Sequence, residues 1–201
     1  MPRNTRAIKK TDLRAQKPWL RKVATFKYPI ESIAKRKRFL IVCEGLTEEL
    51  YLKSFPVLTA DIKLIHQGAS KSALVACIPE YLKDEEYDEV WCVFDMDYKA
   101  GTNGQYDDFD NAIQLTIKSG YKCAYSNDAF ELWFVLHYQF LDQRQLRTFF
   151  FTTLSKYWNL NYEKNGKKRT FALSIYKRLS DDRNSDQEAA IQNAKKLQES
   201  Q

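Results

Sequence analysis

Two short apolar runs in this chain each lead directly into acidic residues. The runs are residues 39–43 and 90–94, and the acidic residues that follow them are Glu44, Glu48, Asp95 and Asp97. In an open α/β sheet, the carboxyl ends of neighbouring parallel strands meet in the crevice that binds ligands. Carboxylates gathered there repel one another unless a cation lies between them. The pattern therefore predicts an α/β fold with a divalent-metal site at one edge of its sheet.

From residue 38 onward, strand-like and helical patterns alternate. We expect strands at 39–43, 62–66, 89–94 and 121–125. We expect helices at 47–55, from 70 or 72 to 83, 109–119, 130–138, 143–158, 171–179 and 186–199, with Thr47 and Asp142 as N-caps. This β-α-β-α-β-α-β succession requires parallel strands joined by right-handed crossovers. The order 2-1-3-4 is favoured because it brings Glu44 and Asp95 out of the sheet side by side.

Basic residues concentrate at the N-terminus. Residues 1–38 hold 13 Lys and Arg against two acidic residues, a net charge of +11, whereas the rest of the chain carries −5. A basic arm on a mildly acidic globule suits a polyanion such as DNA or RNA, although a solvated tail is the alternative. We expect a basic arm over residues 1–36, an α/β core over 37–140 and a helical C-terminal extension packed on the core over 141–201.

The composition also predicts the compartment. No apolar stretch approaches the roughly 18 to 20 residues of a membrane span, and the basic N-terminus lacks the apolar segment of a secretory signal. Cys43, Cys77, Cys92 and Cys123 form no C-x-x-C pair, and two of them lie in expected strands, where buried thiols are common. We expect a cytoplasmic protein without a membrane partner and without a cysteine zinc site.

The acidic residues have structural alternatives. Glu48 fits the first turn of a helix, where acids are common, but it lies one turn from Glu44 and can reach the same crevice. Asp95 and Asp97 point to one side of an extended backbone, and hard oxygen donors at that spacing suit Mg2+ or Mn2+. Glu44 could bridge metal ions or act as a general base. The expected metal ligands are Glu44, Glu48, Asp95 and Asp97.

A phosphate substrate also requires cations near these acids. Lys71 lies in the loop after the second strand and is one candidate, with a surface lysine at a helix start as the alternative. The Lys71-Ser72 pair lacks the preceding glycines of a P-loop, so it does not predict ATP binding. Further candidates for nucleic-acid contact are Lys99, Lys167, Lys168, Arg169, Arg36 and Lys37.

Three motifs resemble those of the RloB-like family: 41–51 (IVCEGLTEELY), 93–97 (VFDMD) and 126–133 (SNDAFELW). The first two are also similar to the TOPRIM domain of topoisomerases, bacterial primases and OLD-type nucleases. The similarity to the RloB-like family covers about residues 38–199. It implies a TOPRIM-like Rossmannoid fold, metal-dependent nuclease activity, a role in bacterial phage defence, and an ATPase or other defence protein as a partner.

The resemblance assigns Glu44 and Glu48 to the first TOPRIM acidic cluster and Asp95 and Asp97 to the second, and it places Glu131 at the acidic position of the third motif. From the residues alone, Glu131 interrupts an apolar run, so it is either a site residue or the partner of an Arg. His137 faces differently on the same helix, and we expect it to be structural.

Two departures from the family pattern stand out. Position 128 holds Asp where the family motif has Pro, which adds a candidate ligand. The chain also stops at Gln201 without the family's Asn-Pro-Ser-Thr ending, a difference that could remove a contact with a substrate or partner.

Together these features predict a Mg2+-dependent endonuclease acting on DNA or RNA, with catalytic residues Glu44, Glu48, Asp95, Asp97 and Glu131. A length of 201 residues leaves no room for the strand-gating domain of a topoisomerase or the extra domains of a primase. The alternative is a non-catalytic subunit that uses the acidic pocket for metal-assisted recognition of nucleic acid while a partner cuts it.

Overall fold

The computed structural model describes residues 35–99, 101–102 and 104–200. The chain divides into two units, Met1–Lys35 and Arg36–Gln201, and nearly all of the described residues belong to the second. The predicted basic arm, residues 1–36, therefore lies outside the described residues except for its last two positions.

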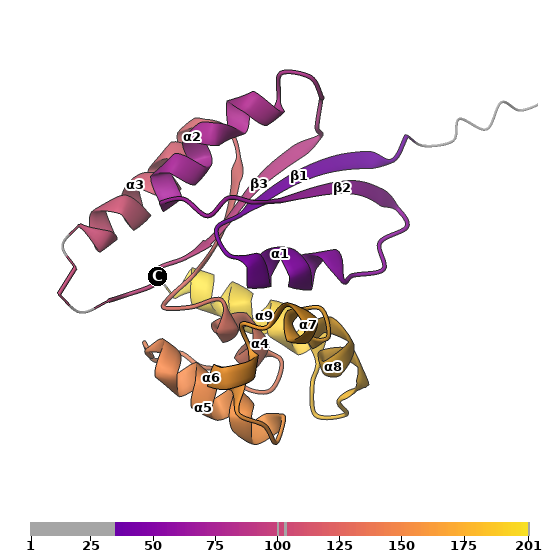
Figure 1. Cartoon of the computed structure of the whole chain (residues 1–201), viewed down its shortest axis with the longest axis vertical. Helices are drawn as coiled ribbons and strands as arrows, with labels where there is room; N and C mark the ends of the chain where they lie inside the picture. Colours follow the sequence, from indigo (N-terminus) through magenta and orange to yellow (C-terminus); the bar gives the residue numbers. More distant parts are fainter. Residues whose placement is uncertain (1–34, 100, 103, 201) are drawn as a thin grey trace, which may run out of the picture. The chain divides into compact units, whose positions relative to one another are not determined.

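Four parallel strands form one sheet: β1 (Lys37–Cys43), β2 (Ala60–His66), β3 (Glu89–Asp95) and β4 (Lys122–Ser126). Their order is β2-β1-β3-β4, as predicted (Figure 1). Cys43 at the end of β1 pairs with Val93, and Asp95 at the end of β3 pairs with Ser126. The N–H of Glu44 donates to the carbonyl of Val93 over 2.9 Å and continues the ladder. The two acidic clusters thus leave the sheet from adjacent strands.

Three helices connect these strands and cover both faces of the sheet (Figure 1). They are α1 (Leu46–Lys53), α2 (Lys71–Tyr81) and α3 (Gln105–Lys118). The direction of strand addition reverses between β1 and β3, so right-handed crossovers place α1 on one face and α2 with α3 on the other. Helix α1 begins at Leu46 with Gly45 as its N-cap, so the predicted cap Thr47 was wrong; α2 passes through Pro79 without a break.

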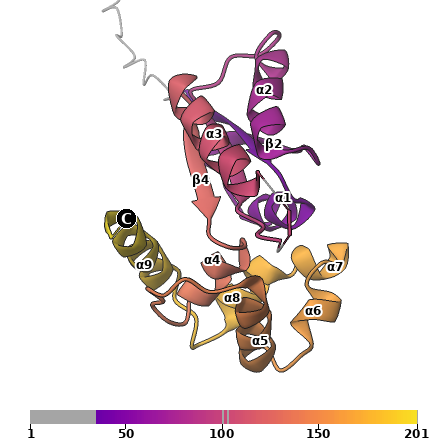
Figure 2. The ribbon, with the colours of Figure 1, turned by 90° about the vertical axis from the view of Figure 1, so that its left-hand side faces the viewer.

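Beyond β4 the chain is helical (Figure 2). The helices are α4 (Glu131–Leu136), α5 (Arg147–Tyr157), α6 (Tyr162–Asn165), α7 (Arg169–Ala172), α8 (Ile175–Asp181) and α9 (Gln187–Glu199). The predicted helix 143–158 begins only at Arg147 with Leu146 as its N-cap, so Asp142 does not cap it. The predicted helix 171–179 is divided into α7 and α8.

Two hydrophobic clusters hold these layers together. The first lies between the sheet and α2 and α3, and it includes Leu40 and Val42 of β1 with Phe94 of β3. Their spacing follows the two-residue period of a strand with one face toward the helices. The second cluster joins Tyr51 of α1 to side chains of α4, α5 and α8, among them Phe134. Helix α4, and with it Glu131, is therefore anchored beside α1 and close to the acidic strand ends.

The remaining general expectations concern cysteines and membranes. All four cysteines are free thiols, and Cys43 and Cys92 are buried in their strands as predicted. Within the described ranges, no helix combines the length and apolar character needed to cross a bilayer.

Candidate metal centre and nucleic-acid interface

Five carboxylates lie within electrostatic range of one another at the carboxyl edge of the sheet. Glu44 follows β1, Glu48 lies in the first turn of α1, Asp95 ends β3, Asp97 follows it, and Glu131 begins α4. Burial, followed by the charges of the other four, raises the pKa of Asp95 from 3.8 to about 8. Acids from three separate parts of the sequence therefore share one electrostatic site.

The oxygen atoms of these acids are not arranged as ligands of a single ion. Across residues 35–99, 101–102 and 104–200, no three Asp, Glu, His or Cys side chains form a group that could hold a metal ion. Protein cations instead neutralise two of the acids. Lys71 Nζ lies 3.2 Å from Glu44 Oε1, and Asp97 pairs with Lys99 Nζ over 3.0 Å and with Arg147. The close cage expected from Glu44, Asp95 and Asp97 is not formed by the side chains as they lie here.

The donor set nevertheless suits a hard divalent cation. Glu44 Oε2 is buried and has no hydrogen-bond partner within the described part of the chain. Burial raises the pKa of Glu44; the adjacent Lys71 lowers it, and Asp97 adds to the rise. Carboxylate oxygens are the ligands that Mg2+ and Mn2+ prefer. A cation at this position would partner the orphaned oxygen of Glu44 and relieve the repulsion that acts on Asp95.

Glu48 is held against the backbone of Gly45. A Cβ built on Gly45 would come within 2.7 Å of Glu48 Cδ, which is closer than these atoms can approach. A side chain at position 45 would therefore displace the Glu48 carboxylate, although the backbone φ of −104° at Gly45 is open to any residue. Burial, together with the charges of Glu131 and Glu44, raises the pKa of Glu48 to about 7, whereas a backbone N–H and Lys167 lower it. The Glu48 side chain thus belongs to the acidic site as well as to the first turn of α1.

Asp128 organises the loop that carries Asp97. It is only 2% exposed, and its Oδ1 accepts a hydrogen bond from the N–H of Tyr98 over 2.6 Å. Its Oδ2 accepts from the N–H of Arg147 over 3.1 Å, and its carbonyl accepts from the N–H of Asp97 over 2.9 Å. Asp128 was a candidate ligand in the sequence. In the structure both of its carboxylate oxygens bind backbone amides, so it acts as a positioning residue.

The two acids of the D-x-D pair differ in their environments. Burial opposes ionisation of Asp97, but the hydrogen bonds and charges of Lys99 and Arg147 outweigh it and hold the pKa of Asp97 below its usual value. Asp95 instead accepts a hydrogen bond from the N–H of Phe130 over 3.3 Å. The pKa values of the two neighbouring carboxyls are thus shifted in opposite directions, up for Asp95 and down for Asp97. Such divergence between adjacent carboxyls is typical of functional sites.

Glu131 is buried like Glu48, at 9% exposure. Its Oε1 accepts a hydrogen bond from the hydroxyl of Tyr162 over 3.0 Å. Burial raises the pKa of Glu131, while its own backbone N–H, Tyr162, Arg147 and Lys167 lower it. From the sequence, Glu131 was expected to be either a site residue or the partner of an Arg. In the structure Arg147 lies close enough to Glu131 to lower its pKa, and Arg147 also pairs with Asp97. Glu131 therefore has a nearby Arg and is also part of the acidic site.

Three of the predicted phosphate contacts lie at the acidic site. Lys71 is 8% exposed, so it is not the surface lysine that was its alternative. Asp108 accepts hydrogen bonds from the N–H groups of Lys71 and Ser72 over 3.1 and 3.3 Å, which fixes the start of α2. Lys99 is exposed and pairs with Asp97, as described above. Lys167 lies close enough to Glu48 and Glu131 to lower the pKa of both.

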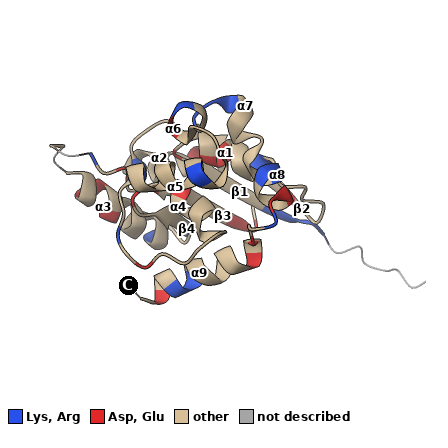
Figure 3. Ribbon diagram, turned by 90° about the horizontal axis from the view of Figure 1, so that it is seen from below, with Lys and Arg blue, Asp and Glu red and all other residues tan. Residues whose placement is uncertain are grey.

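The other predicted contacts lie elsewhere. Lys168 and Arg169 follow Lys167 in the exposed segment where α7 begins (Figure 3). Arg36 and Lys37 lie at the amino end of β1, where they pair with Asp61 over 3.9 Å and Glu89 over 3.8 Å. Lys37 and Glu44 are seven positions apart along the extended chain, which is roughly 23 Å. These two residues are therefore at the opposite end of the sheet from the acids.

Arg147 and Tyr162 were not expected from the sequence. Both come from the C-terminal helices and reach the acids only through the packing of α4, α5 and α6, so no local motif marks them. The motif departure at Asp128 was a partial signal, since it pointed to the segment that holds Arg147. His137 is buried and its Nδ1 lies 2.9 Å from the carbonyl of Trp133, as expected of a structural residue.

Comparison with known proteins identifies the family. The chain matches no curated protein and no solved structure. A model of the RloB-like protein family matches residues 39–201, a stretch that contains all five carboxylates and their neighbouring cations. The chain belongs to the RloB-like family.

Proposed function

We propose that this protein is a Mg2+-dependent, TOPRIM-type endonuclease that hydrolyses phosphodiester bonds of DNA or RNA in the bacterial cytoplasm, as part of anti-phage defence. The observation that carries this proposal is the coupling of five carboxylates at the carboxyl edge of the sheet, with Lys71, Arg147 and Lys167 beside them. A parallel sheet of order 2-1-3-4 and the three sequence motifs support the same assignment. An ATPase or another defence protein is a fitting partner.

Hydrolysis of a phosphodiester requires a nucleophilic water and neutralisation of the scissile phosphate. Mg2+ or Mn2+ held by Glu44, Glu48, Asp95 and Asp97 would lower the pKa of a bound water and neutralise phosphate oxygens. The buried, unpartnered Oε2 of Glu44 is the donor most in need of such a cation.

The protein's own residues supply the remaining functions. Lys71 and Arg147 pair with Glu44 and Asp97 in this arrangement, and they would be available to phosphate oxygens if a cation took their place beside these carboxylates. Burial raises the pKa of Glu131 and Tyr162 fixes its carboxylate by a hydrogen bond, so Glu131 is a candidate to hold or transfer a proton during cleavage. Lys167 adds positive charge beside Glu48 and Glu131.

A second candidate is a non-catalytic, nucleic-acid-binding subunit of a defence complex. The neutralisation of Glu44 and Asp97 by Lys71 and Arg147 favours it, since the described residues contain no ready-made group of three metal ligands. In this case the acids would serve metal-assisted phosphate recognition, and a partner would cut.

Cleavage assays separate the two candidates. Wild-type protein, an Asp95→Ala, Asp97→Ala double variant and a Glu80→Ala control are incubated with plasmid DNA, single-stranded DNA and tRNA in Mg2+, Mn2+ or EDTA. Glu80 is exposed and pairs only with the exposed Lys83 among the described residues, so its removal should leave cleavage unchanged. We expect metal-dependent cutting that EDTA and the double variant abolish. Equal cutting by the double variant would refute the catalytic assignment, and binding without cutting would favour the second candidate.

A further inference from the structure

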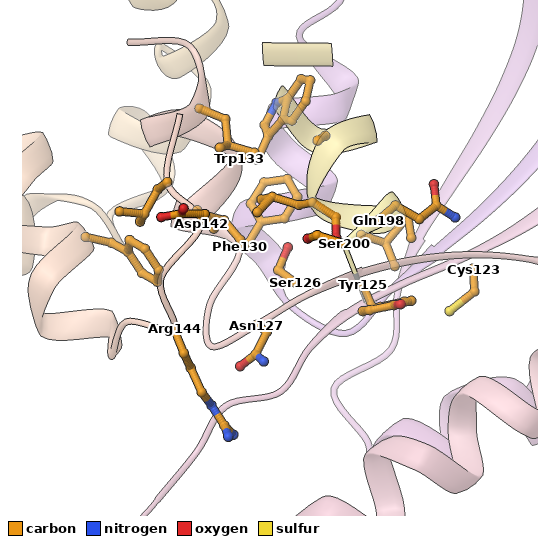
Figure 4. A pocket seen from close by; sticks show the side chains of 18 of the residues that line it. Cys123, Tyr125, Ser126, Asn127, Phe130, Trp133, Asp142, Arg144, Gln198 and Ser200 are labelled. Carbon is orange, nitrogen blue, oxygen red and sulfur yellow. The ribbon is translucent and has the colours of Figure 1, made fainter. Parts of the chain in front are cut away.

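A cavity of about 610 Å3 lies beside the loop that carries the acids. Its walls come from the end of β4, from α4, from α9 and from the segment between α4 and α5 (Figure 4). A volume of this size accommodates a ligand as large as a nucleoside. The cavity is separate from the acidic crevice, and the mechanism above does not use it.

The lining combines aromatic walls with a few polar groups. Phe130 and Trp133 form part of the apolar surface, while Ser126 and Asn127 contribute polar atoms from the end of β4 (Figure 4). The Oδ1 of Asn127 is buried and lacks a hydrogen-bond partner among the described residues. An aromatic surface bordered by a few polar side chains suits a flat heteroaromatic ring, because the ring can stack on the aromatic faces while its polar edge meets the polar groups.

The same short segment of chain connects this cavity to the acids. Its two cavity-lining residues Ser126 and Phe130 also bind the acidic loop: the carbonyl of Ser126 accepts from the N–H of Met96 over 2.9 Å, and the N–H of Phe130 donates to Asp95 over 3.3 Å. A group bound in the cavity would therefore contact the same chain segment that hydrogen-bonds Met96 and Asp95.

Next to the cavity, Arg144 contacts Tyr106, whose exposed ring lies beside that of Tyr98. Arg144 lines the cavity, and its Nη2 reaches the hydroxyl of Tyr106 over 3.2 Å and the sulfur of Met96 over 3.6 Å. Its guanidinium lies 5.6 Å from the centre of the Tyr106 ring. Tyr106 is 47% exposed, and its ring lies 5.8 Å from that of Tyr98, which is 37% exposed. Exposed aromatic rings beside a guanidinium are typical of surfaces on which unpaired bases stack.

We infer that the cavity takes the base of an unpaired nucleotide, and that the strand bound at the acids is therefore single-stranded. This inference rests on the proposed function for the presence of a strand at that site. A paired base cannot enter a pocket without leaving its duplex, so a base-sized cavity next to the acids selects strands whose bases are already free. Arg144 supplies the positive charge for the adjoining phosphate, and Tyr98 and Tyr106 supply the stacking surface for the neighbouring base.

The test measures binding separately from cleavage. Fluorescence anisotropy in EDTA compares 12-nucleotide single strands of DNA and of RNA with duplexes of the same sequence. We expect at least one single strand to bind about tenfold tighter than its duplex, because each stacked base adds affinity. The comparison of DNA with RNA shows which sugar the protein prefers. Tighter binding of the single strand than of its duplex, with either nucleic acid, supports the inference. Equal affinity for single strands and duplexes overturns it. If the protein prefers single strands but shows no nuclease activity, the proposed nuclease function is refuted and the inference about single strands is not.

Two variants and a control localise the effect. Ala194→Phe on α9 fills the cavity, and we expect it to reduce single-strand affinity about tenfold and to leave duplex affinity unchanged. Tyr106→Ala, at an exposed position, should reduce the same affinity, and it decides the question if Ala194→Phe fails to fold. Glu80→Ala is the control, since Glu80 is exposed, does not line the cavity and pairs only with the exposed Lys83 among the described residues. Unchanged single-strand affinity in a folded Ala194→Phe protein, or in Tyr106→Ala, overturns the inference.

Discussion

Replacing Asp95 by Asn should stabilise the protein in the absence of divalent cations. Burial and the charges of Glu48, Glu44, Asp97 and Glu131 raise the pKa of Asp95 from 3.8 to about 8. Between these pH values the unfolded chain has an ionised Asp95, whereas the folded protein retains its proton. The folded state therefore binds more protons, and the free energy of unfolding falls as the pH rises through this window.

The magnitude follows from the size of the pKa shift. Each unit corresponds to about 1.4 kcal/mol, so complete ionisation of Asp95 costs on the order of 5 kcal/mol. The shift of Glu48 arises partly from the same interactions, so the two values do not add. Asn keeps an oxygen to accept the hydrogen bond from Phe130 and carries no charge. We expect Asp95→Asn to raise the melting temperature at pH 8 by roughly 10 °C.

Thermal unfolding followed by circular dichroism at pH 5, 6, 7 and 8 in EDTA checks this expectation. The wild-type melting temperature should fall toward pH 8, and that of Asp95→Asn should fall much less. Added Mg2+ should restore wild-type stability by binding the folded state and should have little effect on the variant. Glu80→Gln removes an exposed carboxylate and should follow the wild type. The reasoning is refuted if Asp95→Asn and wild type show the same pH dependence in EDTA.

Three further substitutions test the surroundings of the acids. Gly45→Ala places a Cβ where the Glu48 carboxylate lies, so metal-dependent cleavage should fall at least about tenfold while the protein remains folded; unchanged cleavage would contradict the proposed role of Glu48. Asp128→Ala removes the acceptor of two backbone N–H groups and should destabilise the protein by about 2 to 4 kcal/mol in urea unfolding, whereas a loss below about 1 kcal/mol would show that these bonds contribute little. Tyr162→Phe deletes the hydroxyl that binds Glu131, so unfolding should become easier by about 1 to 2 kcal/mol and the pH profile of cleavage should shift; an unchanged profile would exclude a proton-transfer role for Glu131.

The strand order was predictable because the acidic positions constrain it. Glu44 and Asp95 can share a site if β1 and β3 are neighbours, which favours the order 2-1-3-4 that the sheet has. Helix ends were harder to predict. Asp142 has the residue type of an N-cap, yet α5 begins at Arg147, whose N–H binds the carboxylate of Asp128. Tertiary contact overrides local preference at that position.

The acidic half of the candidate site follows from local sequence, whereas its basic half was predicted only in part: Lys71, Lys99 and Lys167 were candidates and Arg147 was not. An acid at the end of an apolar run is recognisable because the strand itself determines where the side chain emerges. Arg147 reaches the acids only after the C-terminal helices have packed on one another, and nothing in its neighbouring residues signals this. The pairing of Glu44 with Lys71 also depends on where α2 begins against α3, which the sequence does not reveal.

The most direct test of the account is anomalous diffraction from a crystal of the protein grown with Mn2+. The account predicts a manganese peak at the carboxyl edge of the sheet, within about 2.3 Å of carboxylate oxygens of Glu44, Asp95 and Asp97. It also predicts that Lys71 and Arg147 have moved away from Glu44 and Asp97. Crystals that bind Mn2+ only elsewhere, with both ion pairs intact, would contradict the metal centre and the nuclease proposal built on it.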